Sequence, residues 1–160
     1  MKVLFMCTAN SCRSILSEAM FNHLAPPGFE AISAGSFPKG QVLPRSLSTL
    51  QAAGISIEGL YSKGNDAFED SPPDVVITVC DKAAGEACPV YFGPAVKTHW
   101  GLEDPSEVQG DEAQVEAAFK ATLDIITARC EAFFALPFAR LSPDELKAEL
   151  HRIASTPQPV

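Results

Sequence analysis

Three residues near the N-terminus have the types and the spacing of a site for a tetrahedral anion. Cys7 ends a short apolar run, and Arg13 and Ser14 follow where the sequence pattern turns helical. A tight loop between a strand and a helix brings Cys7 and Arg13 to a common centre, faced by backbone N–H groups and the positive end of the helix dipole. Arg13 can then bind two oxygens of an oxyanion through its forked guanidinium. The same positive field favours the thiolate form of Cys7, a nucleophile to which the Ser14 hydroxyl can donate.

The loop between these residues is expected to supply most of the contacts to the anion. Its predicted oxyanion-binding residues, acting through backbone N–H groups, are Thr8, Ala9, Asn10, Ser11, Cys12 and Arg13. The alternative is that Cys7 is an ordinary buried cysteine at a strand end, since a Cys and an Arg six positions apart also occur by chance. The strand-to-helix position and the adjacent Ser14 favour the anion site.

Length and composition narrow the class of protein. The 160 residues predict a single domain over 1–155, followed by a disordered tail over 156–160. A formal net charge of −8 argues against nucleic acid and anionic membrane as partners, so a local field has to attract any anionic substrate. No apolar run reaches the length of a membrane span, and the apolar stretch after Lys2 is too short for a signal peptide. We therefore expect a cytoplasmic protein whose five cysteines serve chemistry or packing.

Apolar runs and amphipathic segments alternate along the chain, which predicts an α/β fold. The expected strands are 2–6, 29–33, 74–79 and 95–100. The expected helices are 13–24, 44–53, 111–136 and 143–154, with a short one at 65–69. Ser142 and Glu145 are spaced as a capping box at the start of the last long helix. This alternation predicts a single doubly wound domain with a parallel sheet of about four strands. Sites in such folds lie beyond the carboxyl ends of the strands.

Asp104 follows the predicted fourth strand and is a candidate general acid. Pro105 stiffens the loop and helps to fix this carboxylate, which could protonate an oxygen leaving a bound oxyanion. Asp-Pro is also a common turn pair, and without Cys7 a plain turn would be the better interpretation. Because Cys7, Cys80 and Asp104 all follow strand ends, the acid is favoured.

Cys80 and Cys88 have the placement of a thiol relay. Cys80 ends the predicted third strand, which should lie beside the strand that carries Cys7, and Cys88 follows in a segment with few large side chains. Reduction of an oxyanion takes two electrons, so a second thiol must attack the first adduct, and a third can carry the disulfide outward. A zinc site is disfavoured because no second Cys/His pair is spaced to complete it. The plain alternative makes Cys80 a core residue and Cys88 an incidental loop thiol.

The remaining cysteines and the histidines are expected to have structural roles or none. Cys12 should pack beneath the loop, and Cys130 should lie on the apolar stripe of the long helix. His23 and His151 are expected on helix surfaces or partly buried, without a role. For His99, next to the loop of the candidate acid, the sequence indicates no partner.

The segment Cys7–Ser14 resembles the active-site loop of low-molecular-weight protein tyrosine phosphatases, and more closely that of the arsenate reductases built on the same fold. The resemblance extends from Lys2 to about Phe134. Its other motifs are Ser33-Ala34-Gly35, Val76-Ile77-Thr78-Val79-Cys80, Cys88-Pro89 and His99 to Pro105. The phosphatases usually place aromatic residues after their Asp-Pro pair, whereas Ser106 and Glu107 follow it here.

The resemblance implies that the protein reduces arsenate to arsenite for arsenic detoxification. In this scheme Cys7 attacks arsenate held by Arg13 and the loop amides. Ser14 stabilises the thiolate, and Asp104 protonates the leaving hydroxyl.

The resemblance also implies how the electrons are supplied. Cys80 attacks the Cys7 adduct and releases arsenite, and Cys88 then attacks Cys80. The Cys80–Cys88 disulfide is left for an external thiol reductant, thioredoxin or glutathione with glutaredoxin, and no cofactor is bound. The interval from Cys80 to Cys88 looks one residue longer than in the thioredoxin-linked members, which leaves the donor open.

Some members of the family that this chain resembles bind a potassium ion behind the loop. The matching positions are Asn10, Glu18 and Ser33. The alternatives are a solvated helix residue for Glu18 and a role in loop shape for Asn10. The chain also continues past the usual end of the family with a helix from Pro143, to which the resemblance assigns no function.

Two other functions stay open at this point. A low-molecular-weight phosphatase would need Cys7 but neither Cys80 nor Cys88. A non-enzymatic redox sensor or oxyanion-binding module would bind arsenate, or form a disulfide, without turnover.

Overall fold

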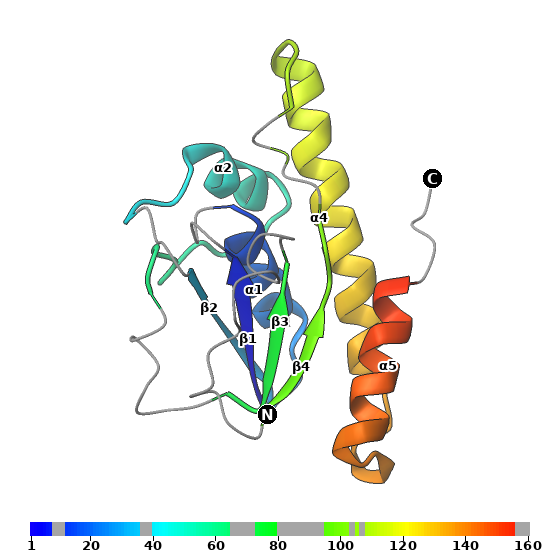
Figure 1. Ribbon diagram of the computed structural model, residues 1–160. Coiled ribbons are helices and arrows are strands. Elements are labelled where there is room, and N and C mark those ends of the chain that lie inside the picture. The colour runs from blue at the N-terminus through cyan, green and yellow to red at the C-terminus, as the bar shows by residue number, and fades with distance from the viewer. Residues whose placement is uncertain are drawn as a thin grey trace.

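A four-stranded parallel sheet forms the centre of the protein in the computed structural model (Figure 1), which describes residues 1–7, 12–35, 40–64, 73–79, 95–102, 105 and 108–155. Its strands are β1 (Lys2–Cys7), β2 (Glu30–Gly35), β3 (Val75–Thr78) and β4 (Val96–His99), in the spatial order β2-β1-β3-β4. All three neighbouring pairs are parallel, so the carboxyl ends lie at one edge. The strand order changes direction between β1 and β3, as in a doubly wound sheet. The predicted α/β fold with a four-stranded parallel sheet is confirmed.

The helices begin and end within two residues of their predicted positions. They are α1 (Arg13–Leu24), α2 (Pro44–Ala52), α4 (Glu112–Phe134) and α5 (Pro143–Ser155), with a 3-10 helix at Phe138–Arg140. Capping explains two of the starts. Asp111 and Gln114 exchange side-chain and backbone hydrogen bonds at the start of α4. Ser142 and Glu145 do the same before α5, which confirms the predicted capping box.

The side chains of β1 alternate between two apolar clusters. The larger cluster contains Val3, Phe5 and Cys7, and the smaller one contains Leu4, Met6, Ala34 and Val76. The larger cluster also takes in apolar side chains of α1, α2, α4 and α5. Aromatic rings fill its centre, with Phe21 5.2 Å from Phe133 and Phe5 6.3 Å from Trp100, measured between ring centroids. The face of the sheet that bears Cys7 is therefore packed against helices.

Helix α5 lies antiparallel beside α4 (Figure 1) and completes this core. Leu146, Leu150 and Ile153 are buried on its inner side. The indole Nε1 of Trp100 donates to the Leu150 carbonyl oxygen at 3.0 Å. Trp100 thus anchors α5 to the segment that follows β4.

Two predicted elements lie outside the described residues, namely the short helix at 65–69 and the tail at 156–160. Among the residues that are described, no helix has the length and apolar character needed to cross a membrane.

Candidate active site

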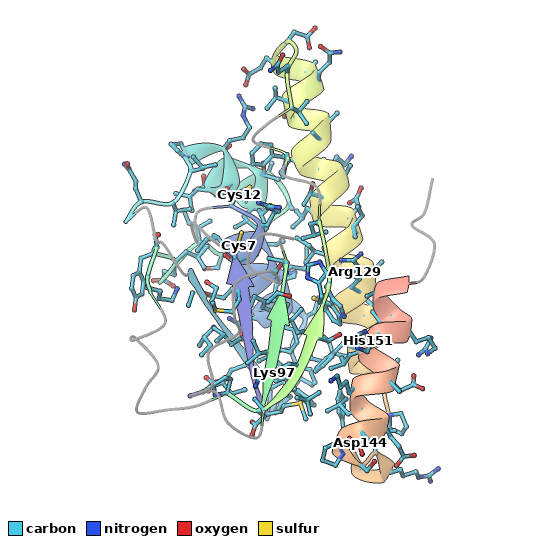
Figure 2. The ribbon with its side chains drawn as sticks, in the orientation of Figure 1. Cys7, Cys12, Lys97, Arg129, Asp144 and His151 are labelled. Carbon is cyan, nitrogen blue, oxygen red and sulfur yellow. The ribbon has the colours of Figure 1, made fainter. Side chains whose placement is uncertain are left out.

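Cys7 is the last residue of β1 and is almost completely buried, with an exposed fraction of 4%. It pairs in register with Gly35 at the end of β2. Figure 2 shows Cys7 at the carboxyl end of its strand, with Cys12 nearby at the start of α1. The predicted nucleophile therefore lies at the sheet edge where sites of doubly wound folds are found.

Helix α1 begins at Arg13, and its first turn is directed toward this edge. Cys12 is the N-cap residue, and within the described part of the chain no side chain caps the helix start. The Cys12 carbonyl accepts from the Leu16 N–H at 2.8 Å, so Cys12 acts through its backbone. Ser14 is fully buried. A helix start of this kind leaves backbone donors and the positive end of the dipole for an anion.

Arg13 connects this helix start to the segment that follows β4. Its Nη1 donates to the Leu102 carbonyl oxygen at 3.0 Å. That segment is also held to β3 by the backbone, since Trp100 N donates to Thr78 O at 2.8 Å and Leu102 N to Val79 O at 3.0 Å. The chain leading to the predicted acid is thus tied both to β3 and to the predicted oxyanion ligand.

Arg129 is a residue that the sequence analysis missed. It lies on α4 with an exposed fraction of 8%, and its Nη1 donates to the Gly101 carbonyl oxygen at 3.1 Å. Burial lowers the pKa of its guanidinium from the ordinary value, because the charged form loses water. Figure 2 shows Arg129 on the part of α4 that runs beside the upper strand ends. A charged residue on the stripe between Ile126 and Cys130 was the signal that could have found it.

Several predicted site residues lie outside the described residues. They are Thr8, Ala9, Asn10, Ser11, Cys80, Cys88 and Asp104. The described residues that precede Thr8, Cys80 and Asp104 most closely in the chain are Cys7, Val79 and Leu102, and these lie at the carboxyl edge of the sheet. Their roles stay predictions.

Cys12 and Cys130 are both buried, in agreement with the structural roles predicted for them. Among the described residues, neither they nor Cys7 form a disulfide. Burial, together with the smaller effect of the neighbouring Glu131 carboxylate, raises the pKa of the Cys130 thiol to about 12. Cys130 is therefore a thiol, not a thiolate, at neutral pH.

The three histidines differ in their surroundings. His23 and His151 are exposed on helices, as predicted. His99, for which the sequence indicated no partner, has its Nδ1 2.8 Å from the Thr78 hydroxyl oxygen. This contact joins the ends of β3 and β4 next to the segment that holds Cys80.

Two of the three residues predicted to hold potassium lie together. The Ser33 hydroxyl donates to Glu18 Oε1 at 2.6 Å, and both side chains are buried. Asn10 lies outside the described residues. The ammonium group of Lys63 is the third member of this cluster in the described part of the chain.

A cavity of about 350 Å³ lies elsewhere, between α2 and α4. Its lining includes Arg45, Thr49, Lys120 and Asp124. None of its lining residues is a predicted site residue. The candidate active site is therefore assigned to the carboxyl ends of the strands and not to this cavity.

Comparison with known proteins gives a consistent set of relatives. Residues 2–151 match the low molecular weight phosphotyrosine protein phosphatase family. The arsenate reductase of Halalkalibacterium halodurans is 30% identical over 131 residues, which cover 82% of this chain and 93% of that protein. The arsenate reductase of Bacillus subtilis is 31% identical with the same coverage.

Solved structures agree with these sequence relatives. An arsenate reductase in the phosphate-binding state matches with a TM-score of 0.70 and 28% identity, covering 84% of this chain and 96% of that chain. The thioredoxin-dependent arsenate reductase of Corynebacterium glutamicum matches with a TM-score of 0.58 and 26% identity, covering 81% of this chain and 61% of that one.

Proposed function

Because the chain belongs to the low molecular weight phosphotyrosine protein phosphatase family, we propose that it is an arsenate reductase that uses a cysteine thiol relay. The observation that carries the proposal is the junction of β1 and α1. There a buried Cys7 ends the central strand, and Arg13 begins a helix whose start no described side chain caps. Relatives named arsenate reductase, at 30% identity or more over most of the chain, favour arsenate over a phosphate ester.

The first half of the reaction is assigned to the β1–α1 junction. Arsenate is bound by Arg13 and by backbone N–H groups of residues 8–13, and the Ser14 hydroxyl stabilises the Cys7 thiolate. The thiolate attacks arsenic, and Asp104 gives its proton to the oxygen that leaves as water. Arg13 also holds the Leu102 carbonyl, which couples the anion site to the loop of the acid.

The second half is assigned to the two remaining thiols of the relay. Cys80 attacks the sulfur of Cys7, the sulfur–arsenic electron pair passes to arsenic, and arsenite leaves. The Cys7–Cys80 disulfide is then attacked by Cys88, which frees Cys7 and leaves Cys80–Cys88. An external dithiol supplies the two electrons that reduce this last disulfide.

The proposed electron donor is thioredoxin. Glutathione with glutaredoxin is the alternative donor system. A structural relative is named as thioredoxin-dependent, which supports this choice. The reaction is placed in the cytoplasm, where thiols are kept reduced.

The test is arsenate-dependent NADPH oxidation by the purified protein with thioredoxin and thioredoxin reductase, run beside the Cys88→Ser variant. The parent is expected to turn over, and the variant to stop after about one equivalent of arsenite, because Cys7 stays in a disulfide. A parent that is inactive with both donor systems, yet hydrolyses an aryl phosphate after Cys80→Ser, would be a phosphatase.

A further inference from the structure

Lys63 is a buried lysine that the relay does not use. It lies between α2 and β3 in the chain and is 9% exposed. A buried ammonium is costly unless its charge and its N–H groups are satisfied. The contacts of Lys63 therefore indicate what it does.

Among the described residues, oxygens from three segments lie around the Lys63 ammonium. Nζ lies 3.3 Å from Glu18 Oε1 on α1, 3.4 Å from Ser33 Oγ on β2 and 3.0 Å from the Tyr61 carbonyl oxygen. It also lies 4.4 Å from the centroid of the Tyr61 ring. The N–H groups of an ammonium can donate to acceptors of this kind. The lysine thus fills a pocket of oxygens as a compact point charge.

The backbone of Lys63 is bound to the strand end next to the predicted nucleophile. The Lys63 carbonyl oxygen accepts from Gly35 N at 2.9 Å, and Gly35 pairs in register with Cys7. Glu18 lies on α1, one turn after the residues that start this helix beside the oxyanion loop. Lys63 therefore ties together α1 and β2, the two elements that flank the end of β1.

The site does not fit potassium as the residues stand. Glu18 Oε1 already accepts from Ser33 and faces the ammonium. A potassium ion bound to this carboxylate would lie close to the Lys63 ammonium, and two neighbouring cations in a buried place repel each other. We propose that Lys63 is a built-in cation, which replaces a bound potassium ion behind the loop and makes this protein independent of potassium.

The test compares thermal unfolding in potassium chloride with unfolding in tetramethylammonium chloride at the same ionic strength. The parent is expected to unfold at the same temperature in both salts. Lys63→Ala removes the ammonium and leaves the three oxygens, so this variant is expected to unfold earlier in tetramethylammonium and to regain part of the loss in potassium. Its affinity for inorganic phosphate, measured by calorimetry, should show the same new potassium dependence. Because unfolding needs no turnover, this result is separate from the test of arsenate reduction.

The matched control is Lys2→Met, which removes the partner of the exposed Glu30 at the opposite end of the strands. It should change stability little and respond to neither salt. If Lys63→Ala does not fold, Lys63→Gln replaces it, with the same expected gain of a potassium response. A parent stabilised by potassium, or a folded Lys63 variant that gains no potassium response, would overturn the proposal.

Discussion

Two helices each carry an adjacent cysteine and arginine, and both arginines hold the same short segment after β4. At the start of α1 the pair is the N-cap residue Cys12 and Arg13, and within α4 it is Arg129 and Cys130. Arg13 and Arg129 donate to neighbouring carbonyl oxygens within 101–102. Residue types and contacts are therefore similar in the two regions.

The two pairs differ in where they lie along their helices. Arg13 is the first residue of α1, close to the end of β1, where the positive end of the helix dipole favours an anion. Cys130 lies within α4 among apolar side chains, and burial raises its pKa to about 12. Cys7 is buried as well, at 4% exposed, so burial alone does not separate a nucleophile from a core thiol. We expect the position at a strand end and a helix start to do so.

The largest effect is expected from Cys7→Ser. A serine hydroxyl in this position is a much weaker nucleophile than a thiolate, so arsenate reduction should fall by about 10⁴-fold or more. Arsenite release measured against the parent under the same reducing conditions tests this. Cys130→Ser provides the matched control and should retain turnover at neutral pH. Equal losses in both variants would remove the distinction between the two regions.

Arg13→Lys is expected to give the next largest effect. Lysine keeps the positive charge but not the fork that binds two oxygens, and it also loses the contact to Leu102. The loss of one or two charge-assisted hydrogen bonds should lower kcat/KM for arsenate by roughly 10- to 100-fold. Steady-state kinetics over a range of arsenate concentrations measures this change. Parent-like kinetics would show that Arg13 does not bind the anion.

Arg129→Met should lower kcat and leave arsenate binding nearly unchanged. Arg129 positions the Gly101 carbonyl, three residues before the predicted acid. Loosening this segment is expected to lower kcat by about tenfold, with a small change in KM. The matched control is Arg152→Met, which removes an arginine paired with Glu149 on α5. A change confined to KM would place Arg129 at the anion itself.

Local patterns were sufficient to predict most of the fold. The Arg13–Leu24 helix was predicted with both ends correct, because an apolar strand precedes it and prolines follow it. The helix from Pro143 was predicted from its capping box. Where an element depends on residues close together in the chain, the sequence carries the information.

Contacts between distant residues were not predictable in the same way. Arg129 and its Gly101 partner are 28 positions apart, and Lys63 and Glu18 are 45 apart. The resemblance indicated a cation near Glu18, but no local pattern indicates that the chain supplies one. The roles of Cys80, Cys88 and Asp104 stay predictions from the sequence, because these residues lie outside the described part.

Cys130→Ala is expected to have the smallest effect on turnover. Its main effect should be on how the free energy of unfolding depends on pH above neutrality. In the unfolded chain the thiol ionises near its ordinary pKa of 9.0, whereas in the folded protein it keeps its proton up to about 12. Between these values the folded state binds a proton that the unfolded state has lost. The free energy of unfolding therefore decreases as the pH rises, by about 1.4 kcal/mol per pH unit from this group. Below pH 9 the group contributes no slope.

The measurement is denaturant unfolding of the parent and of Cys130→Ala, below pH 9 and between pH 9 and pH 12. Removing the sulfur should cost roughly 1–2 kcal/mol at all pH values, through lost packing. The variant should lack the part of the alkaline slope that comes from Cys130, and lysines and tyrosines cancel in the difference because both proteins carry them. Parallel pH profiles would mean that Cys130 ionises as readily in the folded protein as in the unfolded chain. Its burial in α4 would then not distinguish it from a reactive thiol, and the contrast with Cys7 would have to rest on the oxyanion site alone.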